Sequence, residues 1–290
     1  MKVIDVGGLT LQSIFMRIFY TVSHLQSSAA EYLNHWAFIP TMGALHDGHL
    51  SLVQHAKEQG HSVIVSIFVN PTQFNNSEDL AKYPRTIYED LRKLASIGVD
   101  AVFLPSVNEI YPEDGIVKSV HLGLEAESLE GHYRPGHFEG VVMVLRRLFE
   151  IVKPGHVFFG QKDLQQCMVV RRLIQQEFPL IQFNMIETMR ELDGLAMSSR
   201  NERLTAEERI IANEIYQAMA KVSATDMVDS KIQILINELK TNGINTEYFN
   251  YVSLPDLVVV SNRAEAHAVV YAGYLGKVRL IDNLVFKELP

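Results

Sequence analysis

Short apolar runs alternate with longer segments of helical period along the first two thirds of the chain. Runs rich in β-branched and aromatic residues predict strands at 36–39, 62–69, 101–104, 157–159 and 181–186, and a short one at 117–121. Between them, apolar residues three or four positions apart predict helices at 50–58, 86–97, 138–152 and 163–177. This alternation is typical of an α/β fold, in which a parallel sheet carries helices on both faces.

The pattern changes after about residue 188. It predicts helices at 204–222 and 231–242, followed by strands at 248–252, 268–274 and 278–285. Gly276-Lys277 suits the turn of a hairpin between the last two strands. We therefore expect a larger domain over residues 1–187 and a smaller α+β domain over 188–290. For residues 1–35 the pattern indicates only a first strand and helix.

Composition narrows the class of protein. The chain has 290 residues, of which 47% are hydrophobic, and a net charge of −8. An acidic balance disfavours a general nucleic-acid binder, so no nucleic-acid partner is expected. No segment reaches the roughly 18 apolar residues of a membrane span, and the polar interruptions in 9–22 argue against a signal peptide. The single cysteine, Cys167, excludes an intrachain disulfide, fits a cytoplasmic location and lies in an apolar periodic segment that predicts a packing role.

The segment 40–49 carries the first candidate chemistry. His46 and His49 are three residues apart, where a predicted strand gives way to a predicted helix. That spacing places two imidazoles on one face of a first helical turn, above free backbone N–H groups that favour an anion. Gly43 and Gly48 allow a ligand to approach the backbone closely. From the pair alone, two histidines in an ordinary loop are an equally good interpretation.

Amides and charged groups follow two other predicted strands. Asn70 and Gln73 can recognise a carboxylate without adding charge, although by themselves they favour a simple turn. Lys162 can reach a phosphate, and Asp163 can accept ribose hydroxyls or cap the helix that begins there. Gln166, one helical turn later, would point back to the same corner. A plain helix start explains 160–166 equally well.

Three further segments are less specific. The glycine- and histidine-rich segment 130–140 suggests either a ligand loop or a complicated helix entry. Ser198, Ser199 and Arg200 suit a polyphosphate, but surface loops often contain such residues. Glu89 and Asp90 are weak candidates for an indirect metal contact, and the favourable interaction of acids with a helix N-terminus is the preferred interpretation.

In this order, the motifs resemble the pantothenate synthetase (pantoate–β-alanine ligase) family of the nucleotidyltransferase superfamily. Segments 42–49, 68–74, 134–140 and 197–201 carry the resemblance, and the C-terminal third is less diagnostic. The resemblance implies a Rossmann-like domain with a C-terminal lid domain, a homodimer, and ATP with Mg²⁺. It also implies that pantoate attacks ATP to give pantoyl adenylate, which β-alanine converts to pantothenate.

The resemblance also implies roles for residues. It makes His49 a proton donor. The chemistry instead favours His46, His49, Lys162 and Arg200 as catalytic donors to phosphate oxygens, because a carboxylate nucleophile has no proton to remove. The resemblance assigns pantoate and β-alanine to Gln73 and pantoate to Gln166, and the amide of Asn70 is a further candidate for binding these substrates. It assigns ATP binding to Met42, Gly43, Ala44, Leu45, His46, Asp47, Gly48, His49, Gly160, Gln161, Lys162, Asp163, Met189, Met197, Ser198, Ser199 and Arg200.

Two other interpretations stay open. Another nucleotidyltransferase would share the histidine pair but would not need Gln73 and Gln166. A non-catalytic nucleotide-binding protein would keep the fold, although the presence of both histidines, Lys162 and Arg200 argues against it. The chain departs from many family members at Gln161, where glutamate is common, and we expect this change to be tolerated because size and hydrogen-bonding reach are kept.

Overall fold

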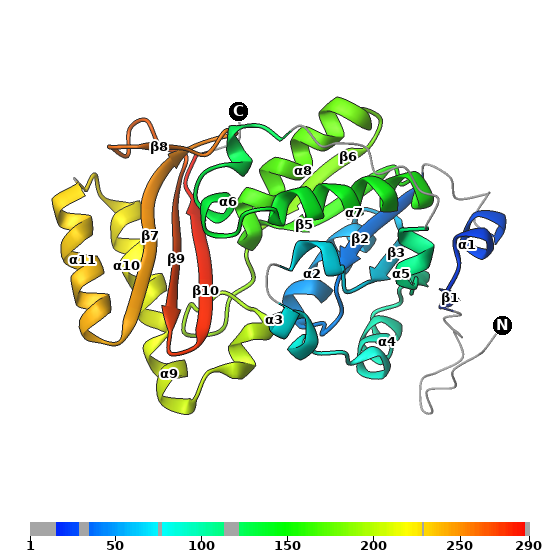
Figure 1. The fold of residues 1–290 in the computed structure, drawn as a ribbon, viewed down its shortest axis with the longest axis horizontal. Coiled ribbons are helices and arrows are strands. Elements are labelled where there is room, and N and C mark those ends of the chain that lie inside the picture. The colour runs from blue at the N-terminus through cyan, green and yellow to red at the C-terminus, as the bar shows by residue number, and fades with distance from the viewer. Residues whose placement is uncertain (1–15, 29–34, 75–76, 113–121, 228, 288–290) are drawn as a thin grey trace. The chain divides into compact units, whose positions relative to one another are not determined.

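The computed structural model describes residues 16–28, 35–74, 77–112, 122–227 and 229–287 (Figure 1). The chain divides into two compact units. The first contains Met1–His121, Arg134–Gly160 and Val169–Ile186, and the second contains Leu122–Tyr133, Gln161–Met168 and Glu187–Pro290. Two short segments from the first part of the chain therefore belong to the second unit. The boundary expected between residues 187 and 188 stays a prediction.

The first unit is built on a six-stranded sheet. Its order is β1 (Arg17–Phe19), β4 (Ala101–Phe103), β3 (Ser62–Ile67), β2 (Trp36–Thr41), β5 (His156–Gly160) and β6 (Gln182–Ile186). All neighbouring pairs are parallel, which confirms the predicted parallel sheet. After β4 the chain returns to place β5 beside β2, so the strand order reverses between these two. Ligands of open α/β sheets bind at the carboxyl ends of strands, next to such a reversal.

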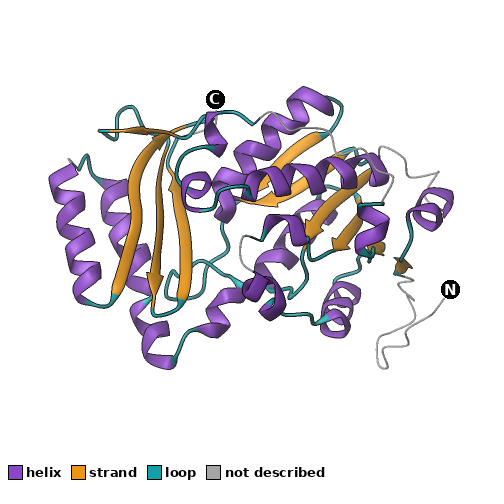
Figure 2. Cartoon of the chain, viewed as in Figure 1, coloured by secondary structure: helices purple, strands orange, loops and turns teal. Residues whose placement is uncertain are grey.

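Helices cover both faces of this sheet, as predicted (Figure 2). Helices α2 (Asp47–Glu58) and α4 (Ile87–Ser96) bury Val53 and Leu94 against Ile39 and Val65. Helix α7 (His137–Val152) lies on the other face, where Phe149 meets Phe38 with ring centroids 6.3 Å apart. Successive strand residues point to opposite faces, so one strand serves both layers. The remaining elements of this unit are α1 (Val22–Ser28), η2 (Pro71–Gln73), α3 (Ser77–Lys82), α5 (Val107–Ile110) and most of α8 (Leu164–Glu177).

The second unit contains the predicted smaller α+β fold. Its antiparallel sheet has the order β10 (Val278–Val285), β9 (Ala268–Leu275), β7 (Ile244–Ser253) and β8 (Val258–Val260). Helices α10 (Asn213–Ala224) and α11 (Asp229–Thr241) pack on this sheet, where Met219 and Leu235 join Tyr271 in one core. The other helical elements are η3 (Leu124–Ala126), α6 (Glu130–Tyr133), η4 (Gln161–Asp163), η5 (Ser199–Arg203) and α9 (Ala206–Ile211).

A few predicted elements differ from the structure. The single helix expected at 204–222 is α9 and α10, which are separated at Ala212. The strand expected at 248–252 begins earlier, at Ile244. The prediction missed its first residues because a β-bulge between Thr246 and Tyr248 interrupts the alternation by which a strand is recognised. Strand β8 was not predicted, and the strand expected at 117–121 lies outside the described residues. Within the described ranges, no helix has the length and apolar character that crossing a bilayer requires.

Candidate functional site

The loop between β2 and α2 presents the two histidines. The backbone turns through left-handed conformations at Gly43 and Ala44, with φ of 80° and 50°. His46 is the N-cap of α2, and His49 lies in its first turn. Their ring centroids are 4.1 Å apart, and the His46 N–H donates to His49 Nδ1 over 3.4 Å. The predicted placement of both imidazoles on one face is therefore confirmed, and the helix begins at Asp47 rather than at residue 50.

Asp90 of helix α4 holds this loop by its backbone. The carboxylate is fully buried, with 0% of the residue exposed. Its Oδ2 accepts the Ala44 N–H at 3.0 Å and its Oδ1 accepts the Leu45 N–H at 2.8 Å. The Thr86 hydroxyl donates to Oδ2 at 3.2 Å, and Lys93 donates to the Leu45 carbonyl. One helix thus satisfies both the donors and an acceptor of the loop.

The contacts of Asp90 bear on the role expected of Gly43 and on the metal contact considered for Glu89 and Asp90. A Cβ on Gly43 would lie 3.0 Å from Asp90 Oδ2, so here the small residue makes room for a protein carboxylate. Glu89 is exposed, whereas both oxygens of Asp90 already accept hydrogen bonds. In the described part of the chain, no three His, Cys, Asp or Glu side chains cluster as metal ligands would. Asp90 therefore supports the loop from within the protein.

The buried Asn70, shortly after the end of β3, forms hydrogen bonds to several neighbouring segments. It is 1% exposed, and its Oδ1 accepts the Tyr111 hydroxyl at 2.9 Å and the Thr72 hydroxyl at 3.0 Å. Its Nδ2 donates to the Gly140 carbonyl at 3.1 Å and to Gln73 Oε1 at 3.0 Å. Burial raises the pKa of Tyr111, which keeps its hydroxyl a donor. The amide of Asn70 is thus occupied within the protein, as the turn interpretation expects.

Gln73 connects this turn to the first loop. Its Nε2 lies 3.3 Å from Met42 Sδ, and a ring nitrogen of His137 lies 3.0 Å from its carbonyl oxygen. Helix α7 approaches closely, since a Cβ on Gly140 would lie 2.5 Å from the Thr72 carbonyl oxygen. Residues 134–140 therefore serve, at least in part, as a helix entry that supports the turn.

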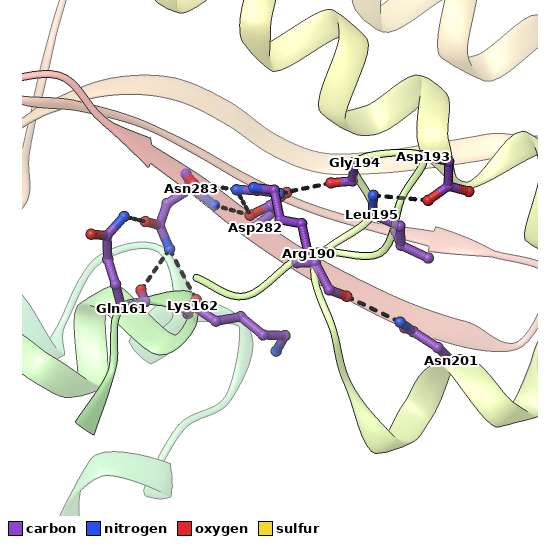
Figure 3. Close-up of polar contacts among 10 residues, drawn as sticks. Gln161, Lys162, Arg190, Asp193, Gly194, Leu195, Asn201, Asp282 and Asn283 are labelled. Carbon is purple, nitrogen blue, oxygen red and sulfur yellow. Dashed lines mark hydrogen bonds and ion pairs between the residues drawn. The ribbon is translucent and has the colours of Figure 1, made fainter. Parts of the chain in front are cut away.

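In the second unit, Lys162 occupies the short turn η4. The Lys162 side chain is 16% exposed, with its ammonium 3.8 Å from Asp163 Oδ1. Asn283 of β10 holds the turn from behind: its Nδ2 donates to the Gln161 carbonyl at 2.8 Å and to the Lys162 carbonyl at 2.9 Å. Gln161 Nε2 donates to Asn283 Oδ1 at 3.1 Å. In Figure 3 the Lys162 side chain points away from Asn283.

A hairpin over residues 189–197 leads to the serine–arginine segment. The Met197 N–H donates to the Met189 carbonyl at 2.9 Å. Arg190 donates to both carboxylate oxygens of Asp282, at 2.6 and 2.9 Å, and to the Gly194 carbonyl at 3.0 Å. A Cβ on Gly194 would lie 2.3 Å from the Tyr216 ring, and the Arg190 guanidinium stands 4.5 Å above the same ring.

Asp282 is an acid in a low-dielectric setting. Burial raises the pKa of its carboxyl, and the Arg190 ion pair, the Asn283 N–H and the Lys162 charge oppose that shift. The two-oxygen contact with Arg190 is the geometry of an ionised carboxylate. The ion pair therefore fixes the base of the hairpin.

The remaining candidates are placed as follows. Ser198 Oγ accepts the Arg200 N–H at 3.2 Å and caps η5, so part of its role is local. Met189 is 40% exposed and Ser199 and Arg200 are half-buried. Gln166 lies half-buried in the first turn of α8.

The neighbours of Gln166 are structural. Gln165 is buried and donates to the carbonyls of Glu125 and Ser128, at 2.8 and 2.7 Å. Cys167 is buried, and burial raises the pKa of its thiol well above the ordinary value. The predicted packing role of this cysteine is confirmed.

Topology explains why the motifs follow these strands. The histidine loop follows β2, and the lysine turn directly follows β5, the two strands between which the order reverses. Helix N-termini and backbone donors at this edge suit a polyphosphate. These features define an α/β protein of the nucleotide-binding class.

Comparison with known proteins identifies the family. Residues 17–285 match the family model of pantoate-beta-alanine ligase, so the chain belongs to that family. It is 43% identical to the pantothenate synthetase of Carboxydothermus hydrogenoformans over 282 residues, 94% of this chain and 99% of that one. It is 42% identical to that of Alteromonas mediterranea over 257 residues, 85% and 90% of the two chains.

Solved structures agree. The crystal structure of pantothenate synthetase from Thermus thermophilus superimposes with a TM-score of 0.85 at 36% identity, covering 94% of this chain and 100% of that one. The Francisella tularensis pantoate-beta-alanine ligase, complexed with beta-gamma ATP and beta-alanine, gives 0.81 at 37% identity, with 93% and 97% covered. The family predicted from the motifs is therefore confirmed.

Proposed function

We propose that the chain joins pantoate to β-alanine at the expense of ATP, through a pantoyl-adenylate intermediate. The observation that carries this proposal is the pair of imidazoles, 4.1 Å apart at the start of α2, in a chain that belongs to this family. The complex of the Francisella relative with an ATP compound and β-alanine supports the substrates.

In the first step, a carboxylate oxygen of pantoate attacks the α-phosphorus of ATP. The bond from that phosphorus to the bridging oxygen breaks, and pyrophosphate leaves with the electron pair. Negative charge grows on the α-phosphate and on the leaving group, where fixed donors lower the barrier. In this proposal His46, His49, Lys162 and Arg200 serve as these donors.

In the second step, the amine of β-alanine attacks the acyl carbon of the adenylate. The acyl carbon–oxygen bond breaks, AMP leaves with the electron pair, and the amine loses a proton. Gln73 and Gln166 contact pantoate in this proposal, with Gln73 also near β-alanine. Asn70 acts through Gln73, because its own amide is occupied by Thr72, Gly140 and Tyr111.

The nucleotide completes the proposed contacts. Residues 42–49, 160–163 and 197–200 line ATP, and the backbone of Met189 contacts adenine. Mg²⁺ would enter on the phosphates of ATP, as this ion commonly does, and would neutralise the leaving group. The described side chains offer no protein cage for it, since Asp90 is engaged by the loop backbone.

Assembly and location follow from the family resemblance alone. We propose a cytoplasmic homodimer whose residues 188–290 act as a lid. Light scattering during gel filtration at several protein concentrations tests the dimer, and a monomer mass would remove it from the proposal.

The first experiment follows AMP and pyrophosphate from ATP with D-pantoate, with and without β-alanine. Exchange of labelled pyrophosphate into ATP with pantoate alone, and AMP release that needs both acids, would support the two steps. Nucleotide binding without turnover of pantoate would instead favour another nucleotidyltransferase.

Gln73→Ala tests the substrate contact. Because Gln73 is proposed to face pantoate, its loss should raise the KM for pantoate much more than the KM for ATP. Gln176→Ala, an exposed glutamine of α8, serves as the matched control. Equal increases in both KM values would place Gln73 elsewhere.

A further inference from the structure

We propose that Asp282 and Asn283 of β10 are positioning residues that tie the Lys162 turn and the 189–197 hairpin into one phosphate-binding body. Neither touches substrate in this proposal: Asn283 acts through the main chain of the Lys162 turn, and Asp282 acts through the Arg190 side chain. The inference rests on the proposed roles of Lys162 and Arg200.

Asn283 fixes the point from which the Lys162 side chain extends. It is 2% exposed, and its amide group donates to two consecutive carbonyls, those of Gln161 and Lys162. The side-chain oxygen of Asn283, Oδ1, accepts a hydrogen bond from the Gln161 side chain. Both the donor group and the acceptor of the Asn283 amide are therefore used. Two consecutive carbonyls held by one buried amide leave the turn little freedom to shift or rotate.

Asp282 anchors the hairpin at residues 189–197 through the side chain of Arg190. It is 6% exposed, and its carboxylate takes two hydrogen bonds from Arg190 and one from the Asn283 N–H at 2.7 Å. Arg190 passes this constraint on, because it also donates to the carbonyls of Gly194 and Asn283, at 3.0 and 3.1 Å. Figure 3 shows Asn283 facing Gln161 and Lys162 while Asp282 faces Arg190.

Two adjacent residues of one strand therefore anchor two segments that lie far apart in the sequence. The Lys162 turn and the hairpin leading to Arg200 share this anchor, so the two cations keep a fixed relation to each other. Charge on a transferring phosphorus is stabilised only by donors held to within a fraction of an ångström. Loss of the anchor should therefore slow the step in which phosphorus is attacked.

Asn283→Asp is the sharpest variant, because it keeps the size and turns two donors toward carbonyls into an acceptor. Two reactions are measured: pyrophosphate exchange with ATP and pantoate, and conversion of supplied pantoyl adenylate with β-alanine. We expect kcat/KM for ATP in the first reaction to fall about 10- to 100-fold. The second reaction should stay within about twofold of the wild type. Asn283→Ser gives the same comparison if the aspartate variant does not fold.

Asn184→Asp is a matched control in the first unit. The Asn184 amide also donates to two main-chain carbonyls, those of Val157 and Gln182, each at 3.2 Å. We expect it to lower the melting temperature without changing kcat/KM for ATP. This control separates a general loss of stability from a loss of phosphate positioning.

The outcomes are distinct. Normal exchange in the Asn283 variants, with slow exchange in Lys162→Ala, would overturn the positioning role and leave the proposed function intact. Equal loss in both reactions would mean a merely structural role and would also overturn it. Normal exchange in Lys162→Ala would remove the proposed role of that lysine, and the inference with it.

Discussion

The histidine loop and the lysine turn are supported by opposite chemistry. In the first unit, the Asp90 carboxylate accepts the N–H groups of Ala44 and Leu45. In the second unit, the Asn283 amide donates to the carbonyls of Gln161 and Lys162. A loop that turns N–H groups inward needs an acceptor, whereas a turn that directs carbonyls inward needs a donor.

Both supports come from distant parts of the chain. Asp90 lies 45 and 46 residues from the groups it holds, and Asn283 lies 121 and 122 residues from its partners. The side chains proposed to meet the ligand, in contrast, belong to the loops themselves. The loops therefore supply the side chains proposed to meet the ligand, whereas residues far away in the sequence hold those loops in place.

The largest expected effect is on a residue that faces the ligand. His49→Ala should slow adenylation by about 10² or more, because a transition-state donor is lost while the fold is kept. Pyrophosphate exchange measures this step, and His55→Ala, an exposed histidine of the same helix, is the control. Near-wild-type exchange in His49→Ala would take this histidine out of the chemistry.

Replacing Asp90, which holds the histidine loop, should lower activity somewhat less than replacing His49, which is proposed to meet the ligand. Asp90→Asn puts an amide donor among backbone donors, which should lower kcat/KM for ATP about 10-fold or more. It should also lower the free energy of unfolding by about 1–3 kcal/mol, the cost of an unsatisfied buried group. Steady-state kinetics and urea unfolding measure the two effects.

Glu89→Gln removes the neighbouring, exposed charge and should change neither quantity. Raising the Mg²⁺ concentration separates two roles for Asp90. Restoration of activity in Asp90→Asn by excess Mg²⁺ would argue for a metal contact and against the loop support.

At the other end of the strands, His156 begins β5, and we expect it to make stability rather than catalysis depend on pH. Burial, and to a lesser extent the charge of His61, lower the pKa of His156, and the two ring centroids are 4.0 Å apart. Below about pH 6.5 the unfolded chain therefore binds a proton at this residue more readily than the native state does. The free energy of unfolding should therefore fall as the pH drops below that value, until His156 titrates in the native state.

Urea unfolding between pH 8 and pH 5 measures this dependence. It should become shallower in His156→Gln and stay unchanged in His55→Gln, whose histidine is exposed. Identical slopes for the wild type and His156→Gln would assign the pH dependence to other groups.

The smallest effect is expected at Gln161. Gln161→Glu loses the hydrogen bond to Asn283 Oδ1, but the half-buried side chain can turn toward water. We expect the free energy of unfolding to fall by about 0.5–1.5 kcal/mol, with kcat/KM for ATP within about threefold of the wild type. A larger kinetic loss would show that this hydrogen bond, and not only those from the Asn283 amide, sets the turn.

Much of the fold was predictable because its signals are local. Strands β2 and β3 are short, buried runs rich in aromatic or β-branched residues, and α7 shows its apolar face directly in the sequence. The prediction failed where a local irregularity breaks the pattern, as at the bulge in β7 and the interruption at Ala212. The ligand role of Asn70 stays a prediction, and its amide donates to Gln73 and Gly140 within the protein.

The sequence by itself determined the family, the parallel sheet and the residues proposed to meet the ligand, since strand and helix periods and the histidine spacing lie within a few residues of one another. Only the tertiary structure decided what holds those residues in place. Asp90 and Asn283 resemble ordinary helix and strand residues in the sequence. Their function as supports exists only because folding brings a buried carboxylate to two N–H groups and a buried amide to two carbonyls, and an unpaired polar group in either place would be costly.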